Sequence, residues 1–171
     1  FYGKTARYSE WIRRGLVESL VLAAVYGDRM TGSESDPQVF VDDVIFRLLT
    51  DADNWEIWAS IKDIMPLLAE AAPKAFMDVL EQKIQSMPSV FVSLMQDDRT
   101  TFGECRHSGL LWALEGLAWK PEYFSKVVEL LASLSKIDPG GTWGNRPQGS
   151  LKDLFLPEVP QTNASPQLRL D

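Results

Sequence analysis

The sequence contains a single cysteine, Cys105, in 171 residues. One cysteine cannot form an intrachain disulfide, so the disulfide-rich scaffolds of small secreted proteins are excluded. A reducing compartment fits this composition best, and we expect a cytoplasmic protein. A chain of this length with 45% hydrophobic residues can bury a core without covalent cross-links.

Long hydrophobic runs are also absent. The apolar stretch 16–25 is interrupted by Glu18 and is much shorter than the roughly 18 to 20 apolar residues that cross a bilayer. It follows basic residues, as a signal peptide does, but no cleavage-like segment comes after it. We therefore expect no membrane-spanning segment and interpret 16–25 as part of a buried helix.

Positive charge is in short supply. The 17 Lys and Arg residues stand against 24 Asp and Glu residues, which gives a net charge of -7 and disfavours an electrostatic grip on nucleic acid or anionic lipid. The densest basic cluster, Lys4, Arg7, Arg13 and Arg14, is expected on the solvated face of a helix. We expect neither nucleic acid nor a membrane as a partner.

Residues for catalysis or metal binding are equally scarce. His107 is the only histidine, and a mixed zinc site with Glu104 and Cys105 would need three ligands from one tight loop. Cys105 and His107 are alternate residues of an irregular segment without an acyl-transfer motif. Glycine-rich nucleotide-binding loops and nucleophile elbows are missing. We expect no catalytic residue, no metal and no cofactor in this chain.

What the sequence does contain is apolar residues at helical spacing in every long segment, without sustained alternation. This pattern predicts an all-α fold. The expected helices are a first one at 9–26 that stops at Gly27, one opening at Pro37 after the cap Asp36, and one at 55–72 that kinks or restarts at Pro66. Further helices are expected from Pro73, from Pro88, around 110–117 and from Pro121.

A short motif, Pro-x-x-Phe, recurs at four of these helix starts. It occurs at 37–40, 73–76, 88–91 and 121–124, with steps of 36 residues from Pro37 to Pro73 and 48 from Pro73 to Pro121. Proline presets the first turn, and we expect the phenylalanine to fill the gap against the preceding helix. The spacing favours irregular antiparallel helix-pair repeats, a HEAT-like α-solenoid; the alternative is an irregular helical bundle.

The end of the chain predicts a short helix and a tail. A capping-box pattern from Ser150 to Asp153 predicts a helix through Phe155. We assign 1–157 to one helical-repeat unit and 158–171 to an extended tail with the start of a truncated helix at Ser165. Because both ends are abrupt, we expect the unit to be an excerpt of a longer array.

The segment 137–149 places an aromatic and a guanidinium among glycines and prolines. One interpretation is a brace, in which Trp143 packs on the helices and Arg146 pairs with an acidic neighbour or with helix carbonyls. The other is a partner-binding loop with Trp143, Asn145 and Arg146 as contact residues. We favour the brace for Trp143 and leave Arg146 open.

From about residue 64 to 162 the chain resembles a segment of large, mostly uncharacterised bacterial multidomain proteins. The resemblance is carried by the stretches MPLLAEAAPKAF (65–76), HSGLLWALEGLAW (107–119), IDPGG (137–141) and NRPQGSLKDLFLP (145–157). It implies a HEAT-type or related helical solenoid. Some of the parent proteins are similar to NTPase-headed bacterial defence proteins, whose helical arms recognise a trigger.

These observations lead us to expect a non-catalytic protein-interaction or scaffold module of a larger bacterial intracellular protein. Its partner would be another protein or other domains of the same chain. The alternatives are the helical sensor arm of an NTPase whose catalytic domain lies outside this chain, or a hydrolase fragment that uses Cys105 and His107.

Overall fold

The computed structural model describes residues 8–31, 36–97, 105–156 and 161–170, without the side chains of 28–31. All regular secondary structure in these ranges is helical, which confirms the all-α prediction. The helices are α1 (Glu10–Thr31), α2 (Pro37–Thr50), α3 (Trp55–Ser60), the 3-10 helix η1 (Lys62–Ile64), α4 (Met65–Ala71), α5 (Pro73–Ser86), α6 (Pro88–Met95), α7 (Ser108–Ala118), α8 (Pro121–Ile137), α9 (Pro147–Leu154) and α10 (Pro166–Leu170). Within the ranges that could be searched, none of these helices is long and apolar enough to cross a membrane.

Most helix starts follow the sequence signals. Proline occupies the first turn of α2, α5, α6 and α8, as the Pro-x-x-Phe motif predicts. Asp36 caps α2 by accepting a hydrogen bond from the Gln38 amide at 2.8 Å, and Asn54 caps α3 through the Ile57 amide at 3.0 Å. These caps satisfy amides that the first helical turn leaves without partners.

The helix at 55–72 restarts before Pro66, which was one of the two expected outcomes. The chain passes from α3 through η1 into α4, with Pro66 in the permissive first turn of α4. Asp63, a polar residue that could cap this restart, does not do so. Ile64 occupies the N-cap position of α4 and forms no side-chain cap.

Two other boundaries differ from the sequence prediction. Gly27 does not end α1, which continues to Thr31; instead Gly27 allows close packing, since a Cβ there would lie 2.4 Å from the Cβ of Pro37. Ser150 does not start α9, which begins at Pro147. Ser150 lies inside this helix, buried, and donates a hydrogen bond to Glu115 Oε1 at 2.6 Å.

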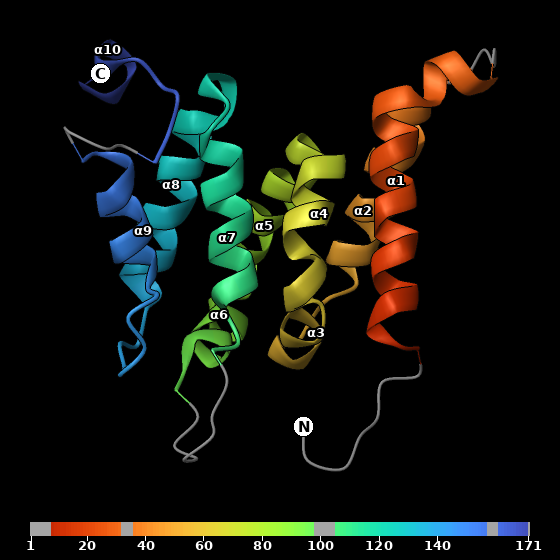
Figure 1. Ribbon diagram of the computed structural model, residues 1–171. Coiled ribbons are helices and arrows are strands. Elements are labelled where there is room, and N and C mark those ends of the chain that lie inside the picture. Colours follow the sequence, from red (N-terminus) through yellow and green to blue (C-terminus); the bar gives the residue numbers. More distant parts are fainter. Residues whose placement is uncertain (1–7, 32–35, 98–104, 157–160, 171) are drawn as a thin grey trace.

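The helices form two layers (Figure 1). Helices α1, α4 and α7 contact each other in series in one layer, and α2, α5 and α8 do so in the layer behind it. Each front helix also contacts a back helix, in the pairs α1 with α2, α4 with α5, and α7 with α8. Helix α3 packs on α6, and α9 covers α8 and α7 at the end opposite to α1.

A continuous hydrophobic core fills the space between the layers. Trp58 is completely buried, donates its indole N–H to the Ala52 carbonyl at 2.9 Å, and meets Phe91 edge-on at a centroid distance of 5.1 Å. The largest of the other fully buried side chains come from α2, α4, α5, α6 and α7: Ile45, Leu49, Met65, Leu68, Phe76, Leu80, Leu94, Met95, Leu110 and Leu111.

The described residues near the C-terminus pack on the helices. The Thr162 hydroxyl is buried and donates to the Ala118 carbonyl at the end of α7, at 2.5 Å, and Ala164 is also buried. Ser165 caps α10 through the Leu168 amide at 3.2 Å, as the sequence predicts. Most of the extended stretch expected at 158–162 lies outside the described residues.

Candidate functional site

The loop between α8 and α9 contains the three residues that the sequence singled out, and Asp97 anchors it. Asp97 follows α6, and its carboxylate accepts hydrogen bonds from both the backbone amide and the hydroxyl of Thr142. Its other oxygen lies 2.5 Å from the Arg146 guanidinium. Together these contacts, led by the bond from the Thr142 amide, lower the pKa of Asp97 below its usual value of 3.8.

Arg146 ties the loop to two further groups at that end of the molecule. Besides Asp97, its guanidinium donates to the Asp138 carboxylate at 3.0 Å and to the Met95 carbonyl at 2.7 Å. The side chain is only 12% exposed. These contacts are of the kind that the brace interpretation describes, an acidic neighbour or helix carbonyls, for a residue whose role the sequence left open.

Two glycines of the loop are required by this arrangement, for different reasons. Gly140 has φ 74°, in the left-handed region that L side chains rarely adopt. A Cβ on Gly141 would come within 2.0 Å of the Arg146 guanidinium and 2.4 Å of the Asp97 carboxyl group. A side chain on Gly141 would therefore displace the ion pair that holds the loop.

The other two candidate contact residues differ from Arg146. The backbone carbonyl of Asn145 accepts a hydrogen bond from His107 Nε2 at 2.7 Å. Trp143 is only partly buried, so the bonds that brace the loop come from Arg146 and Asp97. A partner-binding role of Trp143, Asn145 and Arg146 stays a prediction.

Cys105 and His107 do lie close together, before and at the start of α7. Cys105 Sγ is 3.5 Å from His107 Nε2 and 3.8 Å from Nδ1. Burial lowers the pKa of His107 below 6.5 and raises the pKa of the Cys105 thiol above 9.0. Both shifts favour the neutral thiol and the neutral imidazole, whereas an activated cysteine nucleophile is a thiolate beside an imidazolium.

His107 Nε2 is also committed to another partner. Since the Asn145 carbonyl can only accept, Nε2 carries the proton of the neutral ring. The pair is therefore arranged for packing, with His107 only 2% exposed. Within the part of the chain that the structure describes, no three His, Cys, Asp or Glu residues are grouped as metal ligands. Glu104, the third member of the mixed site considered from the sequence, lies outside that part.

A different surface, on α1, was missed by the sequence interpretation of 16–25 as a buried helix. One side of α1 packs on α2 and α4, with Val17 only 6% exposed. The opposite side, which we call the outer face of α1, exposes a row of apolar and aromatic side chains. They are Tyr8, Trp11, Ile12, Leu16, Leu22, Val25 and Tyr26, with exposed fractions from 47% for Tyr26 to 84% for Trp11.

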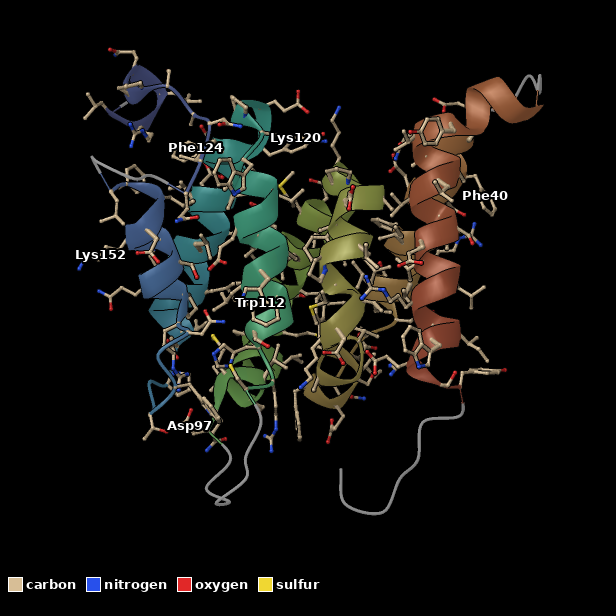
Figure 2. The ribbon with its side chains drawn as sticks, viewed as in Figure 1. Phe40, Asp97, Trp112, Lys120, Phe124 and Lys152 are labelled. Atoms are coloured by element: carbon tan, nitrogen blue, oxygen red, sulfur yellow. The ribbon has the colours of Figure 1, made fainter. Side chains whose placement is uncertain are left out.

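Phe40 of α2 points away from the neighbouring helices at this same edge of the molecule (Figure 2). It is 61% exposed, whereas the other phenylalanines of the Pro-x-x-Phe motif, Phe76, Phe91 and Phe124, are at most 2% exposed. The expected packing of these phenylalanines is thus confirmed for three helices and wrong for α2. The difference follows from position, because α2 is the first helix of its layer.

The basic cluster on α1 is occupied within the chain where it is described. Arg13 donates to the Ser60 carbonyl at 2.6 Å, and Arg14 pairs with Glu18 at 2.8 Å. Lys4 and Arg7 lie outside the described residues.

No protein-family model, no curated protein and no solved structure matches this chain. The resemblance of residues 64–162 to bacterial multidomain proteins therefore remains a prediction.

Proposed function

We propose that this chain is a non-catalytic protein-interaction or scaffold module, built as a short α-solenoid, whose binding surface is the edge formed by α1 and α2. The observation that carries the proposal is the exposed apolar surface on this edge. Exposed apolar side chains that gather on one edge of a domain commonly mark a protein-binding site. The outer face of α1 and Phe40 of α2 provide such a group of exposed apolar side chains.

The arrangement of the helices supports the solenoid part of the proposal. Three helix pairs are stacked so that front helices contact front helices and back helices contact back helices. In such stacks each pair buries its apolar surfaces on its neighbours, and an end pair needs a polar cap or a further partner. Helices α1 and α2 form an end pair whose outward surface is apolar.

The Arg146 loop and the Cys105–His107 pair give less support to a binding or catalytic role. The loop at Arg146 uses its charged groups on Asp97, Asp138 and the Met95 carbonyl. The shifted pKa values of Cys105 and His107 disfavour the ionised pair that nucleophilic catalysis requires.

Photo-crosslinking in the cells that express the protein tests this proposal. A photoreactive amino acid at Trp11, 84% exposed on the outer face of α1, should form a covalent adduct with a protein. The same group at Gln85, an exposed position of α5, is the matched control and should give much less adduct. Equal or absent protein adducts at the two positions would refute an interaction role for this edge.

A further inference from the structure

We infer that the partner of the α1–α2 edge is a second copy of this chain, bound through an antiparallel contact between the two α1 helices. The inference rests on the proposed function and specifies the occupant of the same surface. Three features of the chain support it: the order of residues along α1, the charge at the border of the outer face, and the exposed apolar side chains on that face.

The middle of the outer face follows the spacing of a helix–helix seam. Positions 12, 15, 19, 22 and 26 of α1 are separated by alternating steps of three and four residues, as are the a and d positions of a coiled coil. These positions hold, in order, Ile12, Gly15, Ser19, Leu22 and Tyr26. Tyr8 lies just before the helix, at the end of the strip. A helix with this spacing presents one continuous strip to a partner helix.

The strip is self-complementary when a second copy runs in the opposite direction. With a two-fold axis beside residue 17, Ile12 faces Leu22 of the other copy, and Tyr8 faces Tyr26. Gly15 then faces Ser19, so that the smallest residues meet at the centre. A contact in which the same patch serves on both subunits is the usual form of a homodimer interface.

The small residues at the centre leave room for this approach. A Cβ on Gly15 would have no neighbouring atom within 4 Å, and the Ser19 hydroxyl is turned back onto the Gly15 carbonyl at 2.8 Å. Nothing bulky in the described chain therefore separates the two helix backbones at this point. The larger side chains on either side would pack around it.

The flanks of the strip are compatible with the same symmetry. In this register Leu16 lies beside Leu16 of the other copy on one flank, and Trp11 lies beside Val25 on the other. Glu18 lies on the second flank, where the same symmetry places it beside Glu18 of the other copy. Each Glu18 carboxylate is paired with Arg14 of its own helix at 2.8 Å, and this arginine offsets the like charges of the two carboxylates.

The exposed apolar side chains follow α1 along most of its described length. Six apolar or aromatic side chains of α1, and Tyr8 just before it, are each about half or more exposed. Phe40, 61% exposed at the same edge, adds to this surface.

Sedimentation of the 171-residue chain over a concentration series tests the dimer. We expect the wild-type chain to dimerise reversibly and Leu22→Glu to weaken the dimer about tenfold or more, since a charge at the seam would be buried opposite Ile12. Leu22 is 55% exposed, so the variant should fold. Trp112→Glu on α7, at a residue 57% exposed, is the matched control and should dimerise as the wild type does. A wild-type chain that is monomeric up to about 1 mM, or a Trp112→Glu variant as weak as Leu22→Glu, would overturn the inference.

Cysteine pairing tests the register independently. In a Cys105→Ser background, chains with Gly15→Cys are mixed with chains with Ser19→Cys and oxidised. The antiparallel register predicts more disulfide between the two kinds of chain than within either kind; equal amounts would contradict it. If the chain is monomeric but Trp11 still crosslinks to a different protein in cells, the dimer is wrong and the proposed function stands. Failure of both experiments would refute both.

Discussion

At the scale of single residues, Arg146 joins the end of α6, the end of α8 and the start of α9. Its guanidinium bonds to Asp97, Asp138 and the Met95 carbonyl, with the side chain 12% exposed. Removing a shielded cation leaves its carboxylates without a counter-charge, which costs more than the pair itself contributes. Arg146→Ala should therefore lower the free energy of unfolding by about 2 to 4 kcal/mol in urea denaturation.

Arg47 provides the control for that prediction. Its ion pair with Asp43 lies on the surface of α2, with the arginine side chain 75% exposed. Pairs of this kind contribute little, so Arg47→Ala should change the free energy of unfolding by no more than about 0.5 kcal/mol. Equal losses for the two variants would show that the Arg146 contacts do not brace the loop.

His107 predicts a dependence of stability on pH. Burial lowers its pKa in the folded chain below the usual 6.5, so the unfolded chain takes up the proton first as the pH falls. The stability is therefore fully present above about pH 6.5 and is lost as the pH decreases from there toward the folded pKa. Urea denaturation at about pH 7.5 and about pH 5.5 should show this loss in the wild type.

His107→Gln isolates the contribution of this group. Gln has no titrating group, and its amide can still donate to the Asn145 carbonyl. As His107 is the only histidine, the variant should lose most of the dependence in this window. Glu115, whose pKa burial raises above 4.5, acts with the opposite sign at lower pH. An unchanged dependence in His107→Gln would contradict the assignment.

The sequence indicated which kinds of group Arg146 could pair with, but it did not indicate how deeply Trp143 would be buried. A guanidinium in a loop next to Asp138 has an acidic neighbour in the sequence itself, and pairing follows from charge. The packing of Trp143 depends on which surface the loop covers. This surface is set by the hydrogen bond from Thr142 to Asp97, a residue distant in the sequence. Its partial burial does not provide the deeply buried aromatic on which our expectation of a Trp143 brace relied.

At the scale of helices, Gly109 determines how closely α7 approaches η1. A Cβ on Gly109 would lie 1.8 Å from the Lys62 carbonyl oxygen, whereas Gly116 of the same helix has no atom within 4 Å of that position. Close approach of a neighbouring element thus requires glycine at position 109 and not at position 116. The spacing of the two glycines in the sequence does not show which side of α7 faces a neighbour.

The two glycines allow a matched experiment on α7. Gly109→Ala should destabilise the protein by about 2 kcal/mol or more, because η1 or α7 must shift to relieve the overlap. Gly116→Ala should stabilise it by up to about 1 kcal/mol, since alanine favours the helix and meets no obstacle. Thermal denaturation of both variants measures the difference, and opposite shifts in melting temperature are expected. Stabilisation by Gly109→Ala would mean that α7 and η1 are not packed this closely.

Helix α1 illustrates where helical periodicity is insufficient. Apolar residues recur at helical spacing at Ile12, Leu16, Leu20 and Ala23, but they do not all face the core. Ile12 and Leu16 are more than half exposed. Apolar residues occur on both sides of this helix, and the period does not determine which side packs inward. Contacts of α1 with α2 and α4 decide it.

At the scale of the whole molecule, local signals account for the helices and non-local contacts for their arrangement. Prolines in the first turns and the caps Asp36 and Asn54 define most helix starts. The two layers, and the exposed edge at α1 and Phe40, depend on contacts between helices distant in the sequence. A single sequence does not specify those contacts, so the exposed apolar edge became visible only in the structure.

Amide hydrogen exchange of the full chain at low and high concentration tests most directly whether the α1–α2 edge is the surface of association. Amides exchange through local opening, which burial of a helix face suppresses. We predict that exchange from α1 slows as the concentration rises, while exchange from α8, whose apolar side chains Val127, Leu131 and Leu134 are already fully buried, does not change. Exchange from α1 that is the same at both concentrations, or slowing confined to α7 and α9, would contradict the account.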